Sequence, residues 1–234
     1  MTNRIPGGFG KLRQNIISSA TATLERLAPD QVKAFRQTLE QRKDHEQGFA
    51  ALCGIQASPE FTSWRSICID LIDVELQMHR VKNSLALLNS SSVSPLNQGE
   101  WVEYHVDAWA MLMQGLLYRV EKLTKGVVRG LVRPANTSWR SVETQTLKKI
   151  TGFQKRVKVI RDPVAHSGGA VEVIAHEHLL ESYLLIGGHV DVADMLEPMA
   201  AYGEKWHKHL GYFSTMVLNE IGVVGERLCK EVRW

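Results

Sequence analysis

Two long runs of apolar residues at helical spacing constrain the fold of this 234-residue chain more than any other feature. They cover residues 64–88 and 102–127, and in both the apolar residues recur at alternating steps of three and four. This spacing places all of them on one stripe of an α-helix. We therefore expect two long helices with one buried face each, separated by a Ser-rich connection that ends at Pro95.

The remaining sequence also favours helices. We expect helices over residues 16–27, from Pro29 onward and over residues 139–160, and a helical last third in which Pro198, Gly203 and Gly211 are candidate sites of a bend or an interruption. No strand pattern of any length occurs. Extra apolar residues such as Leu112 widen the second stripe beyond a coiled-coil seam, which favours a bundle. The predicted fold is all-α, a bundle of about five to seven helices. Residues 1–10 are expected to be a flexible N-terminus and residues 11–234 a single helical domain.

Composition excludes several classes of protein. No run of 18 uncharged apolar residues predicts a transmembrane helix, no signal-peptide pattern opens the chain, and we expect a cytoplasmic protein with no membrane partner. Cys53, Cys68 and Cys229 lack metal-ligand spacing, so reduced and packed thiols are expected. Glycine-rich phosphate loops and the serine-hydrolase turn are absent. The net charge of +3 permits an anionic partner without requiring one.

Charge, a helix-start signal and a titratable ring come together in residues 160–169, Ile-Arg-Asp-Pro-Val-Ala-His-Ser-Gly-Gly. Asp162 is a favoured N-cap and Pro163 suits the first helical position, so we predict that a new helix begins here. This start brings Arg161 next to His166, whereas on a continuous helix residues five apart would point away from one another. Free N–H groups of the new helix would bind a phosphate.

A histidine beside a fixed cation at a phosphate site has a specific use. Imidazole can remove the proton of a ribose 2′-hydroxyl while guanidinium bridges the phosphate oxygens. Asp162 would cap the helix and orient Arg161 or His166, and no metal or other cofactor is needed. The alternative is that both side chains merely lie at a helix terminus.

The sequence Arg161-Asp162-x-x-x-His166 resembles the Arg-polar-x-x-x-His signature of the HEPN superfamily, and Ala165 and Gly168 fit its small flanking positions. The resemblance implies a helical bundle, often a homodimer. It also implies a metal-independent endoribonuclease of the kind found in toxin–antitoxin, phage-defence or CRISPR systems, although other members bind nucleotides without cleaving RNA. An antitoxin protein is then an expected partner. Some toxin members carry a tyrosine where this chain has Gly168, so no regulation through that tyrosine is inferred.

Basic residues lead into this motif and could follow an RNA backbone. They are Lys148, Lys149, Lys155, Arg156 and Lys158. The alternative is a solvated helix face. Tyr104 and His105 are auxiliary candidates for the same site, against the alternative of a segment that flanks the apolar stripe. The histidine pairs at 176 and 178 and at 207 and 209 are two residues apart, which does not favour a metal site on a helix.

Three functions follow as hypotheses. The first is a metal-independent endoribonuclease with His166 as general base or acid, Arg161 on the scissile phosphate and Asp162 as the orienting group. The second is a noncatalytic helical module that binds RNA, a nucleotide or a protein. The third is a purely structural bundle.

Overall fold

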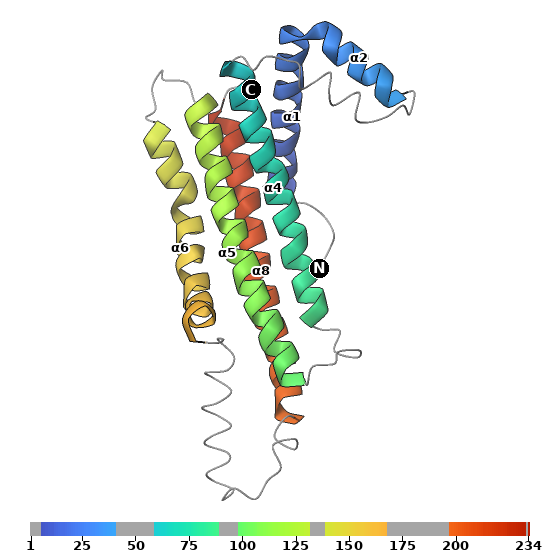
Figure 1. Cartoon of the computed structure of the whole chain (residues 1–234). Helices are drawn as coiled ribbons and strands as arrows, with labels where there is room; N and C mark the ends of the chain where they lie inside the picture. Colours follow the sequence, from blue (N-terminus) through green and yellow to red (C-terminus); the bar gives the residue numbers. More distant parts are fainter. Residues whose placement is uncertain (1–5, 41–58, 89–97, 132–138, 168–196, 233) are drawn as a thin grey trace, which may run out of the picture. The chain divides into compact units, whose positions relative to one another are not determined.

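The computed structural model describes residues 6–40, 59–88, 98–131, 139–167, 197–232 and 234. Within these ranges all regular secondary structure is α-helical (Figure 1). The helices are α1 (Gly7–Leu27), α2 (Pro29–Glu40), α4 (Pro59–Leu88), α5 (Gln98–Leu131), α6 (Trp139–Ser167) and α8 (Glu197–Glu231). The prediction of an all-α fold is confirmed. None of the helices in the described ranges has the length and apolar character needed to cross a bilayer.

The chain divides into two compact units. Unit 1 comprises residues 1–72, 122–145 and 222–234, and unit 2 comprises residues 73–121 and 146–221. The expectation of one domain over residues 11–234 stays a prediction.

Unit 2 is a bundle formed by parts of α4, α5, α6 and α8. Its centre is aromatic: Trp109 of α5 is fully buried, lies edge-on to Phe213 of α8 with ring centroids 5.7 Å apart, and donates its indole N–H to Ser214 Oγ at 3.0 Å. Phe153 of α6 meets the same Phe213 ring at 5.5 Å. Aromatic pairs of this geometry contribute about 1 kcal/mol each beyond the area they bury, so three helices are held together at one point.

In unit 1, α1, α4, α5, α6 and α8 pack as a five-helix bundle. Each contributes fully or largely buried apolar side chains, among them Phe9, Leu12, Ile16, Trp64, Ile67, Leu71, Leu123, Val127, Val142, Val224 and Leu228. Helices α1 and α8 touch backbone to backbone, since a Cβ at Gly225 would lie 2.5 Å from the carbonyl oxygen of Gly8. Glycine at both positions permits this close approach.

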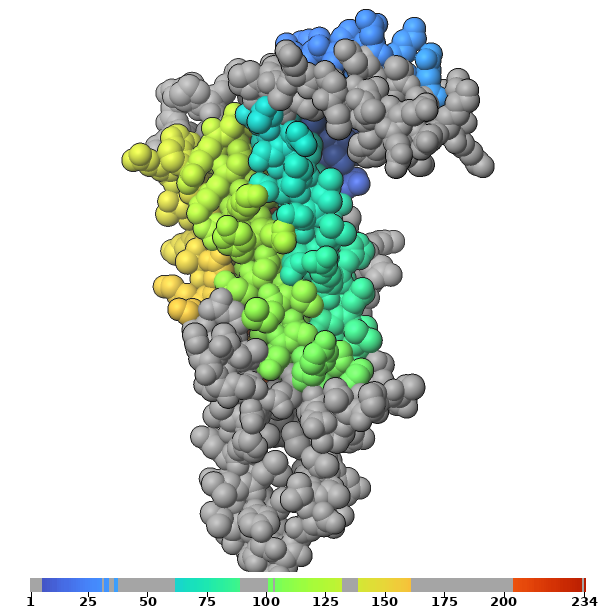
Figure 2. All heavy atoms as spheres, in the orientation of Figure 1, coloured from blue at the N-terminus to red at the C-terminus, as the bar shows by residue number. Residues whose placement is uncertain are grey.

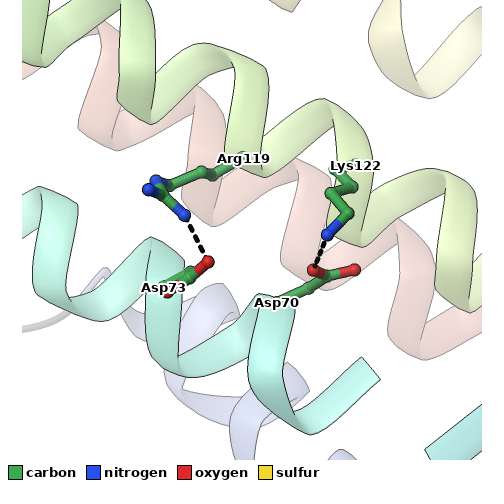
Figure 3. A network of polar contacts seen from close by, with 4 residues as sticks. All are labelled: Asp70, Asp73, Arg119 and Lys122. Atoms are coloured by element: carbon green, nitrogen blue, oxygen red, sulfur yellow. Dashed lines mark hydrogen bonds and ion pairs between the residues drawn. The ribbon is translucent and has the colours of Figure 1, made fainter. Parts of the chain in front are cut away.

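Two ion pairs join α4 to α5, one in each unit (Figure 3). In unit 1, Lys122 Nζ lies 2.7 Å from the carboxylate of Asp70, whose side chain is almost fully buried. In unit 2, Arg119 pairs with Asp73. Burying a carboxylate without a cation costs free energy. The ion pair with Lys122 therefore stabilises the buried Asp70 carboxylate in unit 1.

The two long apolar runs form helices as predicted. Every apolar residue that recurs at steps of three and four in α4 and α5 is buried, from Trp64 to Leu88 and from Val102 to Val127. The end of the first helix at Leu27 and the start of the next at Pro29 are also as expected. Cys68 and Cys229 are free, half-buried thiols, as predicted, while Cys53 lies outside the described residues.

Other boundaries differ from the expectation. Helix α1 begins at Gly7 instead of residue 16, so residues 7–10, expected to be flexible, are helical and Phe9 is buried. Helix α8 continues through Gly203 and Gly211 without an interruption. In both cases packing of an apolar face outweighs the roughly 1 kcal/mol by which glycine disfavours a helix.

Candidate nucleic-acid interface

Helix α6 carries the candidate motif, and its backbone differs from the prediction. The helix is continuous from Trp139 to Ser167, so no new helix begins at Asp162 and Pro163, and that prediction is wrong. A residue before proline marks a helix boundary only as a tendency, because a helix can tolerate the loss of the one N–H that proline lacks. The side chains of Arg161, Asp162 and His166 lie outside the described residues.

Continuity of α6 sets the register of the two motif positions. Positions 161 and 166 lie about 140° apart around the axis of a continuous α-helix. Position 161 follows Ile150 and Val157, which are buried, at helical spacing. Position 166 instead follows Lys148, Lys155 and Val159, which are exposed, at helical spacing. A single copy of this helix therefore does not bring the two positions to one face.

The outward line of α6 is basic. Lys148, Lys155 and Val159 follow one another at steps of seven and four, all are exposed, and position 166 is the next step of seven. Val159 is 75% exposed. Arg156 lies beside this line and is exposed too. We call these four residues the α6 outward face.

The charge of this face is largely uncompensated. From residue 144 to residue 160 the chain contains no Asp or Glu. Among the described residues, Lys148, Lys155 and Arg156 form no ion pair, whereas Lys149 pairs with Glu220 of α8 at 3.0 Å. Lys158 is also exposed, but its side chain already takes part in another interaction, so it is not counted with these three cations. Three cations are thus available to an anionic ligand.

The two auxiliary candidates of α5 have opposite environments. Tyr104 is 62% exposed, whereas His105 is only 5% exposed. The imidazole contacts the rings of Trp101, at 4.2 Å, and Tyr104, at 5.2 Å, and among the described residues its Nε2 has no hydrogen-bond partner. Burial lowers the pKa of His105 below its usual value. A buried neutral ring of this kind does not fit a group that must reach a substrate.

A second group of cations was less apparent from the sequence. In unit 1, Arg129 and Arg140 both lie against the Trp139 ring, 5.3 and 5.4 Å from its centroid. Arg129 also forms a bidentate pair with Glu143 at 3.1 Å, so its charge is already compensated. The adjacent Trp139 and Arg140 were the only signal for this stack in the sequence.

No group of His, Cys, Asp or Glu suited to a metal ion occurs in the part of the chain that the structure describes. His207 and His209 belong to that part, and the pair at 176 and 178 lies outside it. Comparison with family models, with curated proteins and with solved structures finds no match to this chain. The resemblance to HEPN proteins therefore rests on the motif residues alone.

Proposed function

We propose that this protein binds RNA along the α6 outward face. The observation that carries the proposal is the presence of three exposed cations that have no ion-pair partner in the part of the chain that the structure describes. They are Lys148, Lys155 and Arg156, on a helix segment that has no acidic residue. From position 148 to position 166 the line is about 27 Å long, at 1.5 Å per residue. Several consecutive phosphates of one strand fit along such a length.

The physical basis is release of counterions from the phosphate backbone. Each phosphate neutralised on a single strand contributes about −0.7 to the slope of log K against log salt concentration. Three free cations on α6 predict a slope near −2. Val159 lies among them and offers an apolar surface against which a base can pack.

A second candidate function is cleavage of the bound RNA, and the Arg161-Asp162-x-x-x-His166 sequence favours it. In this reaction the ribose 2′-oxygen attacks phosphorus, the bond to the 5′-oxygen breaks, and His166 takes up one proton and returns one to the leaving oxygen. The products are a 2′,3′-cyclic phosphate and a 5′-hydroxyl. Since positions 161 and 166 face apart on a continuous helix, we infer that one copy supplies Arg161 and a second copy supplies His166. A homodimer, an antitoxin and a role in phage defence belong to this second candidate.

Fluorescence anisotropy with a labelled single-stranded RNA in EDTA tests the binding proposal. We expect Lys155→Ala and Arg156→Ala each to weaken binding several-fold and to reduce the salt slope by about 0.7. Lys208→Ala is the matched control, because Lys208 is an exposed lysine of α8 in the same unit. Equal losses in all three variants, or none in any, would contradict binding through α6.

The same samples separate binding from cleavage. If the protein cleaves, 5′-hydroxyl fragments accumulate in EDTA with the wild-type chain and disappear with His166→Ala, while the RNA affinity stays within about twofold. Binding without fragments leaves the noncatalytic function as the conclusion. Fragments that persist in His166→Ala exclude His166 as the catalytic residue.

A further inference from the structure

Helices α6 and α8 are antiparallel neighbours in unit 2. Lys149 Nζ donates to a carboxylate oxygen of Glu220 at 3.0 Å, and the ring of Phe153 lies edge-on to that of Phe213, with centroids 5.5 Å apart. Along these two contacts the residue number rises in α6 and falls in α8, which gives the antiparallel direction. The register of the two helices is thereby fixed.

The outward side of α6 is bounded by two neighbours in this unit. At one edge, Gln154 Nε2 donates to Glu121 of α5 at 2.7 Å, and Figure 2 shows side chains of α6 at the surface beside those of α5. At the other edge, Gly152 and Arg156 follow the α8-bound Lys149 at steps of three and four, and both are exposed. A Cβ at Gly152 would meet nothing within 4 Å, so the space above it is open.

Helix α8 has an exposed aromatic ring at the same level. His209 and Met216 flank Phe213 at steps of four and three, so they share the edge of α8 that faces α6. Tyr212 lies next to this edge on the outward side and is 68% exposed, more than any other Trp, Tyr or Phe of the described residues. Since Phe153 is level with Phe213, Tyr212 lies at a height between those of Gly152 and Arg156.

The charges of this part of α8 do not oppose an anionic ligand. From residue 204 to residue 221 the helix contains two acidic residues, and both are in ion pairs. Glu204 pairs with Lys208 at 3.8 Å, and Glu220 pairs with Lys149 of α6 at 3.0 Å. A phosphate on the α6 outward face therefore meets no unpaired carboxylate from these turns of α8.

The spacing of the two helices suits one nucleotide. Axes of packed helices lie about 8–10 Å apart, so a nucleotide whose phosphate contacts Arg156 can reach Tyr212 with its base, across the open space above Gly152. Bases of every kind stack on aromatic rings, which adds affinity without sequence preference. In a duplex the bases are already paired and stacked, and they are not available to a side chain in this way.

We propose that Tyr212 stacks a base of the RNA strand whose phosphates bind the α6 outward face, so that the protein selects single-stranded RNA. The inference rests on the proposed function, RNA binding through α6, and adds to it a base-binding subsite on a second helix. Arg156 and Gly152 form the α6 side of this subsite, and Tyr212 forms the α8 side with His209 and Met216 beside it.

An abasic oligoribonucleotide, which keeps every phosphate but has no bases, separates the subsite from binding of the backbone. By fluorescence anisotropy, Tyr212→Ala is expected to weaken binding of a single-stranded RNA at least about fivefold, the effect of one base stacked on an aromatic ring. Binding of the abasic strand, and the salt slope, should not change, because no charge is removed. Tyr212→Phe should keep the wild-type affinity. Tyr104→Ala is the matched control, since Tyr104 is a 62% exposed tyrosine of α5 in the same unit.

The outcomes distinguish this inference from the proposed function. Equal affinity of the wild-type chain for both strands overturns the subsite and leaves binding of the RNA backbone intact. Failure of both strands to bind overturns the proposed function as well. A loss in Tyr212→Ala that is equally large for the abasic strand also overturns the subsite, because Tyr212 would then act on the structure of the protein and not on a base.

Filling the open space tests where the base lies. Gly152→Leu is expected to weaken binding of the single-stranded RNA several-fold, while the affinity for the abasic strand stays within about twofold. Gly211→Leu is the matched control, because a Cβ at Gly211 also meets nothing within 4 Å and Gly211 lies about 160° around α8 from Phe213, away from α6. Circular dichroism verifies that both variants are folded. Unchanged or tighter binding of the RNA by Gly152→Leu overturns the proposed position of the base.

Discussion

At the scale of single residues, the environment of His105 has a consequence for stability. The ring is buried and burial lowers its pKa, so below the ordinary pKa of about 6.5 the unfolded chain binds a proton that the folded chain does not. Its contribution to stability is therefore complete above pH 6.5 and is lost as the pH falls toward the folded pKa. We expect up to about 1.4 kcal/mol of loss per pH unit in this window.

Urea denaturation of the wild-type chain and of His105→Gln, each at pH 7.5 and pH 5.5, measures this contribution. The wild-type chain is expected to lose more unfolding free energy between the two pH values than the variant. The comparison between the two chains removes the effect of the other eight histidines. An identical pH dependence in both would mean that His105 is not the titrating group.

The exposure of single side chains was predictable from the sequence at some positions and not at others. The basic residues of α6 were expected either to follow an RNA backbone or to form a solvated helix face, and all five are exposed, which fits both alternatives. Tyr104 and His105 were both auxiliary candidates for the site, yet one is exposed and the other is buried, because neighbours on a helix lie 100° apart. Their environments depend on which side of α5 meets α4, and no local pattern around residues 104 and 105 gives that.

At the scale of elements, the long helices were predictable and the boundaries were not. The apolar periodicity of α4 and α5 specifies a buried stripe over many turns, and no competing local signal interrupts it. At Asp162 and Pro163 a strong local signal was present, but it is shared by helix starts and by prolines inside helices. The choice between them depends on packing along the whole of α6, which continues to Ser167.

The early start of α1 is a packing effect that yields a further prediction. Glycines at 7, 8 and 10 suggested a flexible segment, but Gly8 lies against the backbone of Gly222 and Gly225 in α8. A methyl group at Gly225 would lie 2.5 Å from the Gly8 oxygen and 2.7 Å from the Phe9 nitrogen, and backbone atoms cannot rotate aside. We expect Gly225→Ala to lower the free energy of unfolding by about 1–3 kcal/mol.

Gly152→Ala is the matched substitution for that test, because a Cβ at Gly152 has no neighbour within 4 Å. It should keep or raise the stability, by up to about 1 kcal/mol, through helix propensity alone. Thermal unfolding of both variants beside the wild-type chain distinguishes the two effects. A stable Gly225→Ala chain would show that α1 and α8 separate easily.

At the scale of the whole molecule, the sequence predicted an all-α fold. It did not predict which helix faces are exposed, or which exposed faces are basic or apolar. The net charge of +3 does not indicate that the helix segment from residue 144 to residue 160 lacks acidic residues and has all of its basic residues exposed. The apolar periodicity of α5 identified its buried stripe, but it did not show that Met111, an apolar residue outside that stripe, is 53% exposed. Both surfaces depend on which helix faces are covered, and tertiary packing decides that.

Photo-crosslinking of RNA that contains 4-thiouridine, followed by mass spectrometry of the linked peptides, tests RNA binding through α6 most directly. We expect linked peptides from residues 148–166, and their loss when Lys155 and Arg156 are both replaced by alanine. Links concentrated on α4 or on the Trp139 stack of unit 1 would contradict binding through the α6 outward face, as would the absence of any link at low salt.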